Sequence, residues 1–153
     1  MKFLFVCSEY AEKTPWRDEF DKFINEISAF ASVIVISSGV RDVCFAKLSD
    51  INFPRSNVLG AEFLVDEKTG LISGNRTIVS DVGKGKIVEK LQNDGRNIIA
   101  VGHSEGDRAM IDAANFGIAY CQDDEFKNDA LNIDELRALI YGYFGGILSN
   151  KCF

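Results

Sequence analysis

The residues whose chemistry stands out follow an apolar segment, residues 98–101, that predicts a buried strand. Gly102 ends this segment, and His103, the only histidine of the chain, lies in the polar loop after it together with Asp107. In a parallel sheet, ligands bind in the loops at the carboxyl ends of the strands. His103 and Asp107 are therefore the first candidates for a functional site.

Two further groups could handle a negatively charged ligand. Ser37, Ser38 and Gly39 follow a second apolar segment, residues 33–36, and could surround an oxyanion with hydroxyl and backbone N–H groups. Lys84 opens a predicted helix, where the helix dipole favours anions over cations. A lysine at this position is expected to face a bound anion; the alternative is a solvated lysine.

The composition restricts the classes of partner. A formal net charge of −6 argues against nucleic acid or an anionic membrane as the main partner. The start of the chain has too short an apolar run for a signal peptide. The four cysteines are far apart, without a CxxC pair, so neither a disulfide framework nor a zinc knuckle is indicated. We therefore expect a reduced, cytoplasmic protein.

Short apolar runs alternate with segments of helical periodicity along the chain. Buried strands are predicted at residues 3–6, 33–36, 98–101 and 116–121. Helices are predicted at residues 20–30, 40–48 and 84–93, after Asp107, and around Leu136 to Phe144. A hairpin is predicted from residues 59–65 and 71–73. The order predicts one α/β domain over residues 1–153, with a doubly wound parallel sheet and a small inserted β-hairpin.

Three motifs, taken together and in this order, resemble the haloacid dehalogenase (HAD) superfamily, in its phosphoserine phosphatase-like branch. They are Ser-Ser-Gly after a strand, Lys-Gly-Lys-Ile-Val-Glu-Lys-Leu, and Gly-x-Ser-x-x-Asp-x-x-Met followed by Gly-Ile-Ala. The last motif, which begins at Gly102, is the most specific of the three. The resemblance covers residues 33–120 and implies a HAD-like Rossmannoid fold, here without a cap domain.

The resemblance also implies a mechanism for phosphomonoester hydrolysis. In these enzymes an aspartate at the end of the first strand attacks phosphorus, and a second aspartate two residues later serves as acid and base. Serine and lysine hold the phosphoryl oxygens, and acidic residues of the last motif hold Mg²⁺. By position, Ser37 is the serine, Lys84 the lysine and Asp107 an acidic residue of the last motif.

The sequence departs from this pattern where the nucleophile and the metal should lie. No aspartate follows the predicted strand 3–6. By strand length Cys7 and Glu9 occupy the two positions, and a shift by one residue gives Val6 and Ser8 instead. His103 replaces the first acidic residue of the last motif. Mg²⁺ prefers hard oxygen ligands, which neither a thiolate nor an imidazole supplies. Cys7, His103 and Asp107 would together suit Zn²⁺ instead, if their strand ends are neighbours.

Two functions therefore stay open. In the first, the protein is a pseudoenzyme that keeps a phosphate pocket and binds a phosphorylated small molecule, inorganic phosphate or a protein partner. In the second, it is a phosphomonoester hydrolase that works with substituted groups. The uncharged segment 138–150 adds a third expectation, a homo-oligomer formed through Tyr141, Phe144 and Phe153, although this segment could instead pack on its own sheet.

Overall fold

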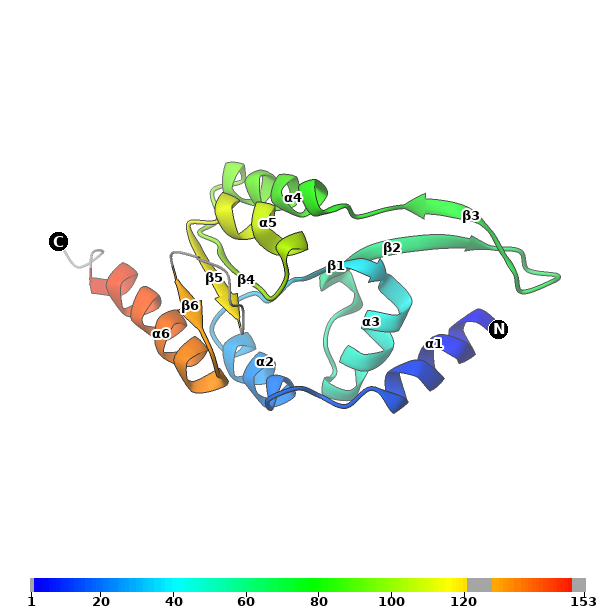
Figure 1. Cartoon of the computed structure of the whole chain (residues 1–153), viewed down its shortest axis with the longest axis horizontal. Helices are drawn as coiled ribbons and strands as arrows, with labels where there is room; N and C mark the ends of the chain where they lie inside the picture. The colour runs from blue at the N-terminus through cyan, green and yellow to red at the C-terminus, as the bar shows by residue number, and fades with distance from the viewer. Residues whose placement is uncertain (1, 121–127, 150–153) are drawn as a thin grey trace. The chain divides into compact units, whose positions relative to one another are not determined.

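The structure, a computed structural model, describes residues 2–120 and 128–149. The chain divides into two compact units, Met1–Ser80 and Asp81–Phe153. Each unit contains a three-stranded sheet with helices packed on it (Figure 1). The predicted α/β class with parallel strands is therefore confirmed, whereas the prediction of one domain over residues 1–153 stays a prediction.

Most of the predicted elements are present, with small shifts of their bounds. The first unit contains α1 (Lys2–Lys13), α2 (Phe20–Ser28), β1 (Val35–Val40), α3 (Arg41–Leu48), two short 3₁₀ turns, β2 (Val58–Val65) and β3 (Ile72–Thr77). The second contains α4 (Asp81–Asn93), β4 (Ile99–Gly102), the 3₁₀ turn η3 (Glu105–Asp107), α5 (Arg108–Ala113), β5 (Phe116–Tyr120), β6 (Asp129–Ala130) and α6 (Ile133–Ser149). Residue 121, predicted as the end of a strand, lies outside the described residues.

The predicted strand at residues 3–6 is wrong, because this segment belongs to helix α1. Cys7 and Ala11, four residues apart, are both buried on one face of the helix. Glu9 and Lys13, also four residues apart, form an exposed ion pair. A four-residue apolar run does not distinguish a buried strand from a helix. The four-residue spacing of the buried pair and of the ion pair is typical of a helix.

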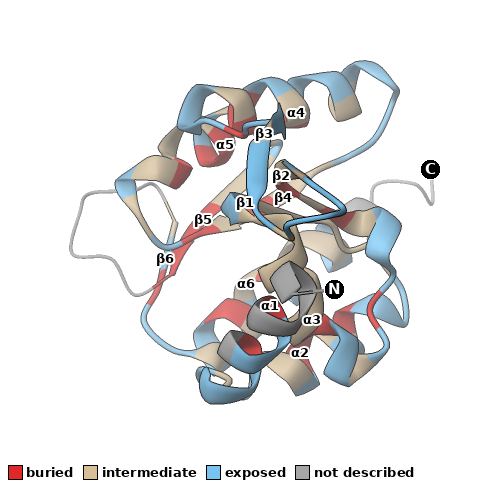
Figure 2. Cartoon of the chain, turned by 90° about the vertical axis from the view of Figure 1, so that its right-hand side faces the viewer, coloured by how far each residue is buried: buried red, intermediate tan, exposed pale blue. Residues whose placement is uncertain are grey.

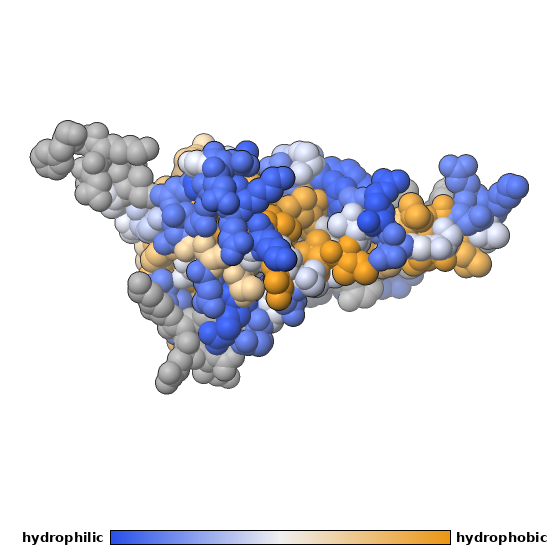
Figure 3. Space-filling view, turned by 90° about the horizontal axis from the view of Figure 1, so that it is seen from above, coloured by the Kyte–Doolittle hydropathy of each residue, from blue (hydrophilic) through white to orange (hydrophobic). Residues whose placement is uncertain are grey.

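In the first unit, helix α3 connects two parallel strands. Strand β1 pairs with β2 in parallel, and β2 pairs with β3 in the predicted antiparallel hairpin. Leu48, Phe53 and Val58 form the buried centre, on which side chains from α2, α3 and β1 pack. Leu64, Leu71 and Ile72 remain exposed and give the hairpin a partly hydrophobic surface (Figure 3).

In the second unit, all strand pairs are parallel, in the order β4-β5-β6. Helices α4 and α5 pack on each other on one side of this sheet, and α6 lies on the other side (Figures 1 and 2). Ile118, Ala119 and Tyr120 make β5 the buried centre of the unit (Figure 2). Gly95, with a φ of 81°, follows the end of α4, where a left-handed backbone conformation favours glycine.

The C-terminal helix α6 packs on the sheet of its own unit. Leu136 and Ile140 are buried, and the ring of Tyr143 stacks on Phe116 with 4.6 Å between the ring centroids. Tyr141 is exposed, and Phe153 lies outside the described residues. The homo-oligomer stays a prediction. No helix of residues 2–120 or 128–149 has the length and apolar character needed to cross a membrane.

Candidate functional site

The loop after β4 is organised around the buried carboxylate of Asp107. Its Oδ2 accepts hydrogen bonds from the backbone N–H of His103 at 3.0 Å and from the N–H of Ser104 at 3.1 Å. The hydroxyl of Ser104 donates a third bond to the same oxygen at 2.9 Å. One carboxylate oxygen thus fixes the direction in which the chain leaves the strand.

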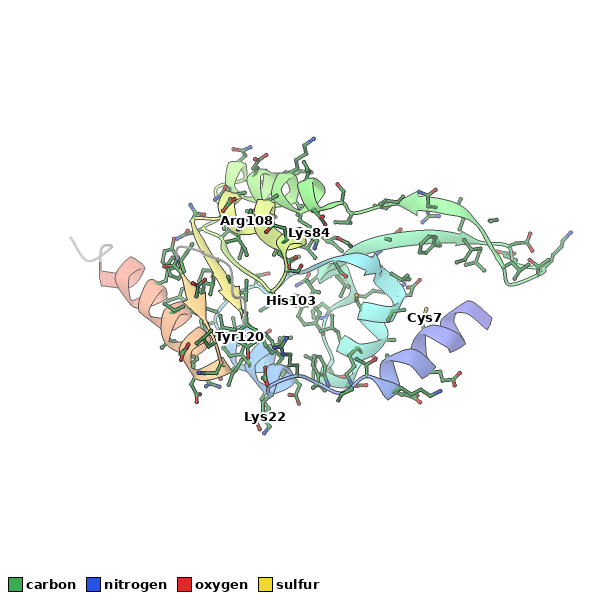
Figure 4. All side chains as sticks on the ribbon, viewed as in Figure 1. Cys7, Lys22, Lys84, His103, Arg108 and Tyr120 are labelled. Carbon is green, nitrogen blue, oxygen red and sulfur yellow. The ribbon has the colours of Figure 1, made fainter. Side chains whose placement is uncertain are left out.

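The other carboxylate oxygen of Asp107 binds Lys84. The Nζ of Lys84 lies 2.7 Å from Oδ1, and both side chains are less than a tenth exposed. Lys84 is in the first turn of α4, so the pair connects this helix to the loop after β4 (Figure 4). Lys84, although it lies at a helix start, therefore has a negatively charged partner within the chain, Asp107. The alternative of a solvated lysine is wrong.

The surroundings of Asp107 stabilise its ionised form. Burial alone would raise the pKa of this carboxyl group, but the hydrogen bonds from Lys84, His103 and Ser104, with the charge of Lys84, outweigh it. The pKa of Asp107 is therefore lowered below its ordinary value. The Nδ1 of His103 lies 3.5 Å from Oδ2, and the imidazole is mostly exposed.

This lowered pKa predicts a loss of stability in acid. A carboxyl group whose pKa is lower in the folded than in the unfolded chain stabilises the fold above its unfolded pKa, about 4. That contribution is lost as the pH falls from about 4 through the folded value. We expect the free energy of unfolding, measured with urea between pH 6 and 3, to fall more steeply for the wild type than for Asp107→Asn. Asp112→Asn, at an exposed position of α5, should keep the wild-type slope; parallel curves for the wild type and Asp107→Asn would contradict the prediction.

Two glycines allow the loop to close on the helix start. A Cβ atom at Gly102 would lie 2.4 Å from the Cβ of Asp107. A Cβ atom at Gly106 would lie 2.9 Å from a carboxylate oxygen of Asp81, the first residue of α4. Cβ atoms do not approach other atoms this closely, so Gly102 requires glycine, whereas a side chain at Gly106 would require the Asp81 carboxylate to move. From the sequence, Gly102 was predicted only to end a strand, and its packing against Asp107 was not predicted.

The residues predicted to surround an oxyanion in the first unit do not lie where they were expected. Ser37, Ser38 and Gly39 lie within β1 and not in a loop after it. The N–H of Gly39 donates to the Oγ of Ser37 at 3.0 Å, so this N–H is not free for a ligand, as the prediction required. The hydroxyl hydrogen of Ser37 still offers one donor. The role of Ser37, Ser38 and Gly39 in phosphate binding stays a prediction.

Cys7 and Glu9 do not end a strand, so their placement at the positions of the missing Asp-x-Asp motif is wrong. Both belong to α1. Burial, with the nearby charge of Asp42, raises the pKa of the Cys7 thiol, which disfavours the thiolate that a nucleophile or metal ligand requires. The zinc hypothesis also assumed that Cys7 lies at a strand end, and that assumption is wrong.

The donor groups around Asp107 do not fit Mg²⁺. Oδ2 of Asp107 already accepts three hydrogen bonds, and Oδ1 accepts one from the positively charged Lys84, so a cation could use only the remaining lone pair of Oδ1 beside that charge. The imidazole of His103 is a poor ligand for this hard cation. Within residues 2–120 and 128–149, no three side chains of His, Cys, Asp or Glu come together in a way that could hold a metal ion.

Comparisons with known proteins identify the fold. No protein-family model matches the chain, and no curated protein matches it in sequence. Among solved structures, a phosphoserine phosphohydrolase-like protein from Francisella tularensis subsp. tularensis matches with a TM-score of 0.65 at 19% identity. The match covers 88% of this chain and 68% of that protein.

A second solved structure, that of DsGPDH from Dunaliella salina, matches with a TM-score of 0.63 at 21% identity. This match covers 86% of our chain but only 24% of that protein. Identities this low establish the fold and not the activity. Together with the α/β architecture, the hairpin and the absence of a cap among the described residues, they show that the chain has a fold similar to that of the phosphoserine phosphohydrolase-like protein.

Proposed function

We propose that this protein binds inorganic phosphate or a phosphorylated small molecule through Lys84 and hydrolyses phosphomonoesters weakly or not at all. The observation that carries the proposal is the position of the Lys84 ammonium, which Asp107 holds at the start of α4 in a chain of phosphatase-like fold. The helix dipole adds positive potential at this end of the helix. An anion that reaches Lys84 would therefore meet a charge that is already in place.

Lys84 keeps hydrogen-bonding capacity for such a ligand. An ammonium group has three N–H donors, and the bond to Asp107 uses one of them. Charge-assisted bonds to phosphate oxygens are about twice as strong as neutral ones. Because Asp107 fixes the side chain, little further conformational entropy is lost when the anion binds. The phosphate-binding role of Ser37, in the first unit, stays a separate prediction with its own test.

The residues that would carry hydrolysis do not support an efficient phosphatase. The 153 residues contain no Asp-x-Asp sequence. Cys7 and Glu9, the groups considered in its place, lie on a helix, and the pKa of the Cys7 thiol is raised. Loss of a covalent nucleophile lowers turnover by several orders of magnitude. Binding without rapid turnover is therefore the function that the described residues support best.

The binding proposal predicts that phosphate stabilises the protein in a Lys84-dependent way. At 100 times its dissociation constant, a ligand adds about 2.7 kcal/mol to the free energy of unfolding. For a chain of this length that corresponds to a rise in Tm of roughly 5–10 °C. We expect this rise with the wild type and with Lys86→Ala, which removes an exposed lysine of the same helix, but not with Lys84→Ala.

The measurement is differential scanning fluorimetry with sodium phosphate, against sodium chloride of equal ionic strength. Each variant is compared with itself, because Lys84→Ala lowers the Tm even without ligand. An equal phosphate-induced shift in Lys84→Ala and the wild type would contradict the proposal. Steady hydrolysis of p-nitrophenyl phosphate that Lys84→Ala or Ser37→Ala abolishes would instead favour the phosphomonoester hydrolase.

A further inference from the structure

We infer that the anion site at Lys84 works without a divalent cation, because the Lys84 ammonium takes the place that Mg²⁺ would need at Asp107. The inference rests on the proposed function for the identity of the anion, but its central claim concerns Asp107 alone. A metal-dependent phosphate site uses the cation both to neutralise charge and to orient oxygens. Here the ammonium neutralises the carboxylate, and the hydrogen bonds of the loop orient it.

Both oxygens of the Asp107 carboxylate already accept hydrogen bonds from the chain. Oδ1 accepts the bond from Lys84, and Oδ2 accepts the three bonds from His103 and Ser104. A cation bound to Oδ2 would have to displace donors of the loop, two of which are backbone N–H groups. A cation bound to the remaining lone pair of Oδ1 would have to share this oxygen with the Lys84 ammonium.

A cation that approaches Asp107 would also be repelled by the positive charge of Lys84. The Lys84 ammonium lies 2.7 Å from Oδ1 and is buried, so water screens its charge weakly. A divalent ion at coordination distance from Oδ1 would lie within a few ångströms of this positive charge. Displacing Lys84 would leave a buried ammonium without its carboxylate. The buried pair thus disfavours Mg²⁺ by repulsion as well as by occupancy.

His103 and Asp81 are the other potential metal ligands near this carboxylate. His103 is the nearest titratable neighbour in the loop, and its nitrogen ligands suit softer metals. Asp81 approaches the loop at Gly106, but the described residues contain no group of three potential ligands that could hold an ion. Asp107 is therefore a positioning residue for Lys84 and the loop, and not a metal ligand.

Titration of the wild-type protein with MgCl₂ alone tests this claim without any phosphate. Isothermal titration calorimetry should detect no saturable binding up to about 5 mM Mg²⁺, a concentration above the roughly millimolar range of weak sites. The Tm should be the same in Mg²⁺ and in EDTA at equal ionic strength. Saturable binding, together with a Mg²⁺-induced rise in Tm that Asp107→Asn removes, would overturn the inference.

A second titration separates this inference from the proposed function. Phosphate is titrated into the wild type in EDTA and in 5 mM Mg²⁺, a concentration chosen above the roughly millimolar range of weak sites. The inference predicts equal phosphate affinities, within about twofold. An affinity at least tenfold higher in Mg²⁺ would overturn it. Absence of phosphate binding in both buffers would contradict the proposed function, while the MgCl₂ titration would still decide whether Asp107 binds a metal.

A variant without the Lys84 ammonium should differ most from the wild type in its response to Mg²⁺. Lys84→Met keeps an unbranched side chain but exposes Oδ1 of Asp107 to other cations. We expect this variant to gain a Mg²⁺-induced rise in Tm, while Lys86→Met stays as unresponsive as the wild type. A folded Lys84→Met variant that responds to Mg²⁺ no more than the wild type would contradict the role assigned to Lys84. Should the variant fail to fold, the two wild-type titrations still decide the inference.

Discussion

Replacement of Asp107 by alanine is expected to lower the free energy of unfolding of the second unit by about 3–5 kcal/mol, as is typical when one partner of a buried ion pair is removed. The substitution leaves the buried Lys84 ammonium without its carboxylate. It also removes the acceptor of the N–H groups of His103 and Ser104. The cost is therefore larger than the net value of the ion pair alone.

The control for this variant is Asp112→Ala, which removes an exposed aspartate of α5 and should change stability by less than about 0.5 kcal/mol. Unfolding is best followed by urea titration with circular dichroism, or by hydrogen exchange over residues 81–153. Intrinsic tryptophan fluorescence is unsuitable for following the second unit, because the single tryptophan, Trp16, belongs to the first unit. A change below about 1 kcal/mol for Asp107→Ala would show that the loop does not depend on this carboxylate.

A double variant tests whether the pair serves stability or function. If the pair is kept for anion binding, replacement of both partners by hydrophobic residues, Lys84→Met with Asp107→Leu, should cost much less than Asp107→Ala alone. Such exchanges of buried ion pairs are often neutral. The double variant should nevertheless lose the phosphate-induced rise in Tm, because the ammonium is absent.

The sequence predicted most elements because their patterns are strong. Phe23 and Ile27 have helical spacing and are buried in α2, and the apolar segment before Gly102 forms β4. The strand predicted at residues 3–6 failed because four apolar residues fit a strand and a helix equally well. The two-residue strand β6, Asp129–Ala130, could not be predicted, since it is too short to show any periodicity.

The candidate site was predicted in its residues but not in its connections. Lys84 and Asp107 were both selected, yet they were assigned separate tasks, one towards phosphate and one towards a metal. Their direct contact joins residues 23 positions apart, and local patterns carry no information on such a pairing. The sequence did contain a hint, because a lysine at a helix start opposes the helix dipole and calls for a negative partner.

The glycine that begins Gly-Ile-Ala has a packing role that was also missed. Gly117 is the second residue of β5. A Cβ atom at Gly117 would lie 2.3 Å from the carbonyl oxygen of Ile111 and 2.6 Å from its Cγ2. Helix α5 thus rests directly on the backbone of β5, and this close approach sets the position of the helix that follows the Asp107 loop.

Substitution of Gly117 by alanine is therefore expected to destabilise the second unit by about 1–3 kcal/mol or more, the range for overpacked sites. The nearest atom belongs to the backbone of α5, so no side-chain rotation relieves the contact. In the matched control, the expected change in the free energy of unfolding has the opposite sign. Gly142→Ala, on an exposed turn of α6 with open space around it, should stabilise the protein by about 0.5–1 kcal/mol.

The two glycine variants are compared by urea unfolding, with circular dichroism as the signal. Because α5 begins directly after Asp107, a shift of this helix should also disturb the carboxylate that holds Lys84. Gly117→Ala is then expected to weaken the phosphate-induced rise in Tm as well, although it removes no charged group. Equal stability of Gly117→Ala and the wild type would show that α5 can move away from β5 at no cost, and that the Asp107 loop does not depend on this contact.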